Sequence, residues 1–149
     1  MNDGGALPQS LEAERAVLGG LMLDPDQCLV IAESLKPDDF YREAHGNLFG
    51  LMVGMAEANQ PTEMVAVIER VIATGVAEDV GGLSYVQGLG DNIPSTQNLE
   101  YYAGIVEERA IARRLIVGVQ QIEEQARTGA ADLDELLDFA EKTVFDVTQ

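Results

Sequence analysis

Apolar residues recur at intervals of three and four along most of the chain, which is the spacing of helices that bury one face. Ser10 is a favourable N-cap for the first such segment, where Val17, Leu18 and Leu21 lie toward one side. Prolines separate the segments that follow, because proline is tolerated in the first turn of a helix but not further inside. No alternating run typical of a strand is present. The pattern predicts helices at about residues 11–22, 25–35, 43–59, 63–74 and 83–89.

Three glycines share one face of the third predicted helix, because Gly46, Gly50 and Gly54 are four residues apart. Each costs about 1 kcal/mol relative to alanine inside a helix. A face without side chains lets another backbone approach closely. We therefore predict that this face takes part in a crowded helix crossing in the core.

A single long helix is predicted from Asn98 to Arg127, because about 30 residues pass without a proline. Gly129 is placed as its C-terminal stop, and Asp132 with Glu135 resembles a capping box that opens a last helix. Two helices joined by so short a link pack antiparallel. The predicted seam of this hairpin comprises Ile105, Ala112, Leu115, Val119, Ile122 and Ala126 on the first helix and Leu133, Leu137, Ala140, Val144 and Val147 on the second.

These elements predict an all-α fold, a small orthogonal helical bundle followed by a long antiparallel helical hairpin. The apolar stripe of the long helix is wider than one partner helix covers, since Val106, Ile111 and Ile116 lie off the seam. The rest of the chain, a second copy or another protein must cover it, and the sequence leaves these alternatives open. The predicted parts are a flexible tail at residues 1–9, a globular lobe at 10–93 and the hairpin at 94–149.

The chain is strongly acidic, with 26 acidic and 9 basic residues among 149 and a formal net charge of −17 at pH 7. Its largest basic cluster is only Arg113 and Arg114, which argues against tight binding of nucleic acid by phosphate neutralisation. The acidic surface suits a basic partner, and the alternative is an acidic face that is only solvated. No apolar stretch approaches the ~20 residues of a membrane span, and no secretory signal is present. Cys28 is the only cysteine. We expect a cytoplasmic protein without an internal disulfide.

No pattern in the chain is typical of an active site. The G-x-x-x-x-G-K-[ST] sequence of a phosphate-binding loop is absent, and the single histidine, His45, leaves no ligand set with the spacing of a zinc site. His45 has Glu43 nearby in sequence but no serine in a nucleophile-elbow context, so we interpret it as a core or surface residue. We predict no catalytic residue, cofactor site or metal site in this chain.

A series of short segments carries a more specific signal. In chain order these are Leu7–Glu14 with Val17–Gly20, Asp39–Tyr41 with His45 and Phe49, Pro61–Thr62, Gly81–Val86, Pro94–Asn98, and Tyr102–Val106 with Arg109–Ile116. Each is weak alone, but the set in this order is specific. In these segments, and over nearly its whole length, the chain resembles the N-terminal domain of the DnaB-family replicative helicases of bacteria and their phages.

The resemblance implies a helical lobe and a hairpin, in agreement with the periodicity. In the family, hairpins pair between neighbouring subunits, three such dimers build a collar over a hexameric motor, and primase docks on that collar. The chain would then mediate hexamer assembly and recruit the primase C-terminal domain at the replication fork, with a helicase loader as a further candidate partner. The seam residues would be hairpin or dimer contacts. The candidates for the primase surface are Tyr85, Ile111, Ile116 and Ile122, each with an ordinary core position as the alternative.

The chain departs from the family's pattern at a few positions and at its end. Glu63 stands where the family usually has aspartate, Met64 where it has leucine, and Gly50 and Gly54 are unusual. The chain stops at Gln149, about where the family's linker begins, so we expect a fragment without the RecA-like ATPase that uses ATP and magnesium in the parent helicase. The alternative is a stand-alone regulator, for example from a phage, that mimics the collar. A P-loop in the reading frame after Gln149 would favour the first hypothesis, and a stop codon the second.

Overall fold

The chain divides into two compact units. Residues 9–107 form one unit, the lobe, and residues 108–149 form the other, the hairpin unit, together with Leu7 and Pro8. The computed structural model describes residues 7–91, 93, 96–129 and 131–149.

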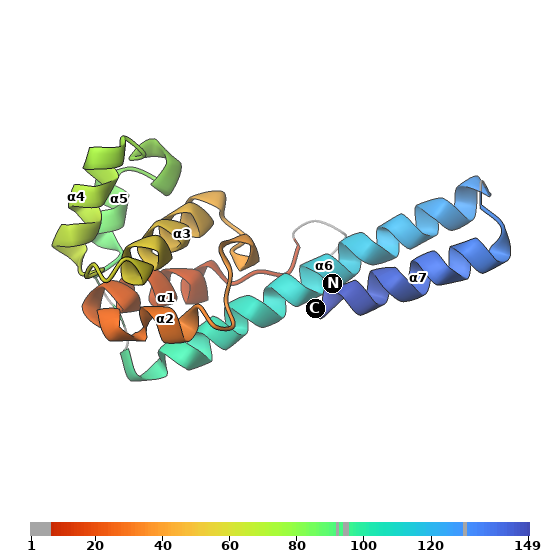
Figure 1. The fold of residues 1–149 in the computed structure, drawn as a ribbon, viewed down its shortest axis with the longest axis horizontal. Coiled ribbons are helices and arrows are strands. Elements are labelled where there is room, and N and C mark those ends of the chain that lie inside the picture. Colours follow the sequence, from red (N-terminus) through yellow and green to blue (C-terminus); the bar gives the residue numbers. More distant parts are fainter. Residues whose placement is uncertain (1–6, 92, 94–95, 130) are drawn as a thin grey trace. The chain divides into compact units, whose positions relative to one another are not determined.

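Every regular element of the described residues is helical, as the sequence pattern predicts (Figure 1). Within that part of the chain, no helix has both the length and the apolar sequence that a membrane span requires. Single turns of 3₁₀ helix lie between the α-helices, at Pro25–Gln27, Pro37–Asp39, Glu78–Val80 and Thr96–Asn98. The α-helices are α1 (Leu11–Leu23), α2 (Cys28–Ile31), α3 (Glu43–Glu57), α4 (Met64–Thr74), α5 (Leu83–Gly88), α6 (Leu99–Thr128) and α7 (Leu133–Val147).

The boundary between the units lies inside α6 and not at residues 93 and 94, where the sequence analysis placed it. The first turns of α6 belong to the lobe because Leu99, Ala103 and Val106 are buried in its core. The helical pattern of the sequence continues through this point, so it does not reveal that the first turns of the helix pack in the lobe and the later turns belong to the hairpin unit. The predicted tail, residues 1–9, lies mostly outside the described residues.

The helix ends follow the capping residues that the sequence supplies. The Ser10 hydroxyl accepts a hydrogen bond from the Ala13 N–H at 3.2 Å, which confirms it as the N-cap of α1. Asp132 and Glu135 form the predicted capping box of α7, each side chain accepting from the other's backbone N–H, at 2.8 and 3.3 Å. Gly75 ends α4 in the left-handed region, with φ of 70°.

The second predicted helix is much shorter than expected. It was predicted to reach about residue 35, but α2 ends at Ile31 and the next residues form a turn with bonds from Glu33 to Val30 and from Ser34 to Ile31. Pro37 limits how far a helix could extend here, because a residue before proline is driven out of the helical region. Lys36 is accordingly extended, with φ of −117° and ψ of 157°.

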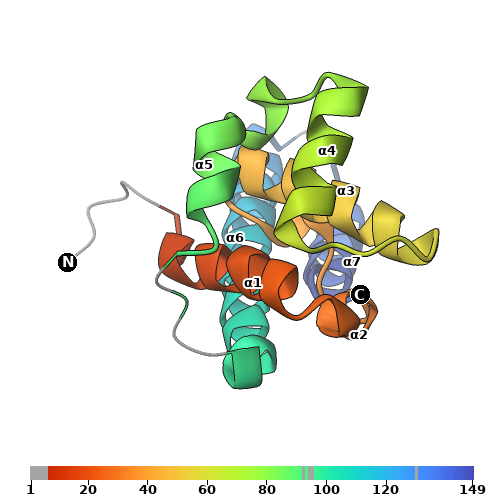
Figure 2. The ribbon, with the colours of Figure 1, turned by 90° about the vertical axis from the view of Figure 1, so that its left-hand side faces the viewer.

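The core of the lobe is formed by the apolar faces that the periodicity predicts. Helix α3 packs against α1 and α2, and α4 packs against α1 and α5 (Figure 2). The rings of Phe40 and Phe49 meet with their centroids 5.1 Å apart. The fully enclosed apolar side chains include Val17, Leu18, Leu21, Leu48, Phe49, Met52, Val67, Val71, Val86 and Leu99.

The predicted crowded glycine face is only partly correct. A Cβ at Gly46 would lie 2.5 Å from the Pro37 carbonyl oxygen, so the close approach is real there, but it is to a 3₁₀ turn and not to a crossing helix. Gly54 has no heavy atom within 4 Å of such a Cβ. The tightest approach is instead in α1, where a Cβ at Gly19 would lie 2.0 Å from the Leu89 carbonyl oxygen.

Cys28 is expected to be unreactive in the folded protein. It is fully buried, and burial raises the pKa of its thiol from 9.0 to about 11, with the negative charge of Glu57 acting in the same direction. At pH 8 the folded chain would thus hold roughly 100-fold less thiolate than the unfolded chain. We expect labelling by a thiol reagent at pH 8 to be slower by at least this factor without urea than in urea. Equal rates would contradict the burial of this side chain.

Candidate functional site

Helices α6 and α7 of the hairpin unit run antiparallel, as predicted (Figure 1). The two helices approach closely at Gly118, where a Cβ would lie 2.9 Å from Cγ2 of Thr143 and 4.0 Å from Cγ2 of Val147. Gly118 and Val147 are both buried. The inner faces of the two helices therefore meet through small or β-branched side chains.

Most of the predicted seam residues do not lie between the two helices. Ile122 is half-buried, and Ile105 packs against the core of the lobe. Val147 is buried, Ala112 and Ala140 are half-buried, and Ala126 is exposed. The remaining five are exposed by 42 to 68%, and we name them the apolar flank: Leu115, Val119, Leu133, Leu137 and Val144.

The three apolar residues off the predicted seam, for which the sequence left the covering partner open, are largely covered within the chain. Val106 is buried in the core of the lobe, and Ile111 and Ile116 are half-buried. For Val106 the structure therefore shows the first of the three alternatives, cover by the rest of the chain.

The residues of the apolar flank lie on one side of the hairpin. Successive residues of a helix are rotated by about 100°, so Leu115 and Val119 are turned by roughly 60° and 100° from Gly118, which faces α7. On α7, the three flank residues are turned by roughly 80° to 120° in the same sense from Thr143, which faces α6. Because the helices are antiparallel, the same sense of rotation brings both stripes to the same side.

The opposite side of the hairpin has a different character. It carries a groove of about 460 Å³ whose lining includes Leu7, Arg114, Val117 and Asp146. Arg113 also borders this groove, and its guanidinium donates a hydrogen bond to the Pro8 carbonyl oxygen at 2.8 Å. The largest basic cluster of the sequence is therefore engaged, at least in part, in holding the N-terminal segment.

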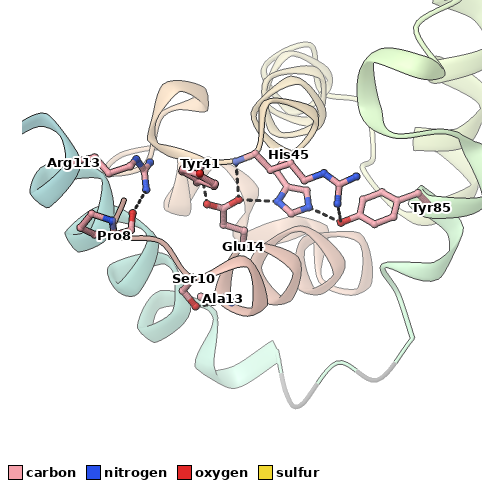
Figure 3. A network of polar contacts seen from close by, with 9 residues as sticks. Pro8, Ser10, Ala13, Glu14, Tyr41, His45, Tyr85 and Arg113 are labelled. Atoms are coloured by element: carbon pink, nitrogen blue, oxygen red, sulfur yellow. Dashed lines mark hydrogen bonds and ion pairs between the residues drawn. The ribbon is translucent and has the colours of Figure 1, made fainter. Parts of the chain in front are cut away.

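In the lobe, a buried chain of polar groups joins three helices (Figure 3). The ring of His45, on α3, is fully enclosed, with Nδ1 2.7 Å from a carboxylate oxygen of Glu14 on α1 and Nε2 2.5 Å from the hydroxyl of Tyr85 on α5. The Glu14 carboxylate also accepts from the backbone N–H groups of Tyr41, at 2.7 Å, and Arg42, at 3.4 Å. No buried side-chain nitrogen or oxygen of the described residues lacks a hydrogen-bond partner.

A cleft of about 540 Å³ opens beside this chain of polar groups, wholly within the lobe. Helix α1 contributes Glu12 and Arg15 to it, α5 contributes Tyr85, and α6 contributes Tyr102. Ser84 and Asp91 add polar groups, and Ala16, Gly88, Leu89 and Ile93 complete the lining. A cleft of this volume with both polar and apolar groups in its lining is able to receive part of a ligand or partner.

The sequence analysis selected Tyr85 as a surface candidate and interpreted His45 as ordinary. The structure places Tyr85 half-buried, with its ring in the cleft and its hydroxyl on His45. Local spacing carries no signal of this link, because Glu14 and Tyr85 are 31 and 40 residues away from His45. The acid that neighbours His45 in sequence, Glu43, is not the one that it contacts.

Comparison with known proteins agrees with this architecture. A family model described as the DnaB-like helicase N-terminal domain matches residues 6–108. Over 142 residues the chain is 42% identical to the replicative DNA helicase DnaB of Geobacillus stearothermophilus and 39% identical to the replicative DNA helicase DnaC of Bacillus subtilis, which covers 95% of this chain and 31% of each helicase. The chain thus spans about a third of the length of these relatives.

Solved structures show the same fold. The N-terminal domain of the DnaB helicase from Mycobacterium tuberculosis superposes with a TM-score of 0.86 at 34% identity, covering 95% of this chain and 99% of that domain. A DnaB-like replicative helicase, described together with its interactions with primase, superposes with a TM-score of 0.74 at 24% identity, covering 93% of this chain and 31% of that one. The second likeness concerns the fold alone.

Proposed function

The chain belongs to the DnaB-like helicase N-terminal domain family, and on this premise we propose that it works as a collar module that self-associates and recruits primase. Unwinding of DNA, with its need for ATP and magnesium, would be carried out by the remaining two thirds of a helicase like the relatives. The described residues would contribute assembly and docking at the replication fork in the cytoplasm, and no catalysis.

The apolar flank is the observation that carries this proposal. Five large aliphatic side chains on one side of a two-helix hairpin are exposed by 42 to 68% in the single chain. A row of exposed apolar side chains favours burial against another apolar surface. A second copy supplies a matching surface by symmetry, because the same face is used by both partners in a two-fold dimer.

The lobe supports the second half of the proposal. The ring of Tyr85 lines an open cleft, and its hydroxyl is hydrogen-bonded to His45. This is the pattern of an aromatic anchor at an interface. The acidic chain favours a partner with basic residues. A solved DnaB-like helicase is described with its interactions with primase, and this partner is the one we propose. Ile111, Ile116 and Ile122, in the hairpin unit, remain further candidates for the docking surface.

The proposal predicts the mass of the chain in solution. Light scattering at increasing concentration should show a shift from 16.0 kDa toward twice that value or more, because the apolar flank becomes covered on association. Adding the C-terminal domain of primase should produce a further, saturable increase. A constant 16.0 kDa at all concentrations, with no change on adding primase, would contradict both halves of the proposal.

Replacing Tyr85 by alanine should weaken the binding of the primase C-terminal domain by about tenfold or more, as for an interface hot spot. Tyr101→Ala is the matched control, because Tyr101 is an exposed tyrosine of the lobe that does not line the cleft. Calorimetric titration gives both affinities, and circular dichroism verifies that each variant is folded at the working temperature. Equal affinities of the two variants would remove Tyr85 from the docking surface.

A further inference from the structure

His45 does not line the cleft, but its ring contacts a residue of each of the two helices that form the cleft walls. One ring nitrogen contacts Glu14 on α1, the helix that also carries Glu12 and Arg15 in the wall of the cleft. The other ring nitrogen contacts Tyr85 on α5, the opposite wall. The imidazole is fully enclosed, so water does not compete for either contact.

The donors and acceptors of this bridge have a definite order. A carboxylate accepts and does not donate, so the hydrogen between His45 and Glu14 belongs to Nδ1. In a neutral imidazole, Nε2 is then an acceptor, and the Tyr85 hydroxyl must donate to it. The Tyr85 oxygen in turn accepts from the Arg42 guanidinium at 3.3 Å. The position of the Tyr85 hydroxyl is thus determined by its two neighbours, His45 and Arg42.

Arg42 supports Tyr85 less firmly than His45 does. Its hydrogen bond to the Tyr85 hydroxyl is longer, 3.3 Å against 2.5 Å, and lies at the exposed surface. Its guanidinium carbon also lies 4.6 Å from the centre of the Tyr85 ring, a contact that constrains the ring face but not the hydroxyl. The enclosed contact with His45 therefore has the larger influence on where the phenol ring points.

We infer that His45 is a positioning residue for the docking surface: through Glu14 it is anchored to α1, and through the Tyr85 hydroxyl it holds the phenol ring in the orientation that a partner segment meets in the cleft. This inference rests on the proposed docking function of Tyr85. It adds that the affinity of the partner depends on a side chain that the partner does not touch.

Two substitutions of His45 separate positioning from simple stability. In His45→Asn the amide nitrogen replaces Nδ1, so the bond to Glu14 is retained and Tyr85 is released. In His45→Gln the amide reaches as far as Nε2, so the bond to Tyr85 is retained and that to Glu14 is lost. Each variant loses one hydrogen bond, and His45→Gln is expected to lower the unfolding midpoint more than His45→Asn, because the bond that it loses is to a buried carboxylate.

Binding of the primase C-terminal domain should separate the two variants. We expect His45→Asn and Tyr85→Phe each to weaken binding roughly fivefold, the equivalent of one hydrogen bond, and their combination to weaken it no further. His45→Gln should stay within about twofold of the parent chain. Equal weakening by the Asn and Gln variants, or additive effects of His45→Asn and Tyr85→Phe, would overturn the inference.

A second measurement needs no partner and so separates failure of this inference from failure of the proposed function. In a chain with labelled tyrosine rings, the Tyr85 signals, assigned from Tyr85→Phe, should move in His45→Asn toward the positions of exposed tyrosines and stay in place in His45→Gln. Unchanged Tyr85 signals in His45→Asn would overturn the inference even if primase binds. Moved signals without any binding of primase would refute the docking function and leave the positioning of Tyr85 intact.

Discussion

Leu115→Asp is expected to convert the self-associated chain into monomers. Leu115 lies in the apolar flank, where a second copy would enclose it, and an unpaired carboxylate in an apolar interface costs several kcal/mol. A two-fold interface buries the substitution twice. Dimerisation should therefore weaken by at least about 100-fold, and light scattering should give 16.0 kDa at concentrations where the parent chain is associated.

Val117→Asp is the matched control for this experiment. Val117 is two residues away on the same helix and has almost the same exposure, 43% against 42% for Leu115. It points to the opposite side of the hairpin, into the groove beside Leu7 and Arg114. If the apolar flank is the interface, Val117→Asp should keep the mass of the parent chain. Monomers from Val117→Asp and dimers from Leu115→Asp would place the interface on the side of the groove and contradict the proposed role of the apolar flank.

Gly19→Ala should destabilise the lobe by about 3 kcal/mol or more, the upper range of overpacking effects. The added methyl would lie 2.0 Å from the Leu89 carbonyl oxygen and 2.5 Å from Cδ1 of Ile93. The nearer atom belongs to the backbone, so relief requires the whole segment that follows α5 to move away from α1. Urea unfolding followed by circular dichroism measures the change.

Gly54→Ala provides the contrast within the same lobe. No heavy atom lies within 4 Å of the added methyl, and alanine is favoured over glycine in a helix by up to about 1 kcal/mol. This variant should be slightly more stable than the parent chain. Equal stability changes for Gly19→Ala and Gly54→Ala would show that helix propensity alone, and not the close approach of Leu89, determines the effect.

The candidate site was only partly predictable from the sequence. Tyr85 was selected because it is an aromatic residue on a short apolar helix, and the structure places its ring in a cleft. The support of that ring by His45 and Glu14 was missed, since contacts between residues 31 and 40 positions apart leave no trace in local spacing. The flank residues were all named as hairpin or dimer contacts, and the sequence did not distinguish these two roles.

What the sequence determined by itself is the set of helices and most of their ends. Helix period, N-caps such as Ser10 and Asp132, and breaks at proline depend on interactions between residues within about four positions of each other. Such interactions can therefore be inferred from a short stretch of sequence. The tertiary structure alone decided which side of α6 and α7 is covered and which groups surround His45. Both depend on how closely segments far apart in the sequence approach each other. Gly19 allows the backbone at Leu89 to come close, and Gly118 allows Thr143 to do so, and neither contact can be inferred from neighbouring residues in the sequence.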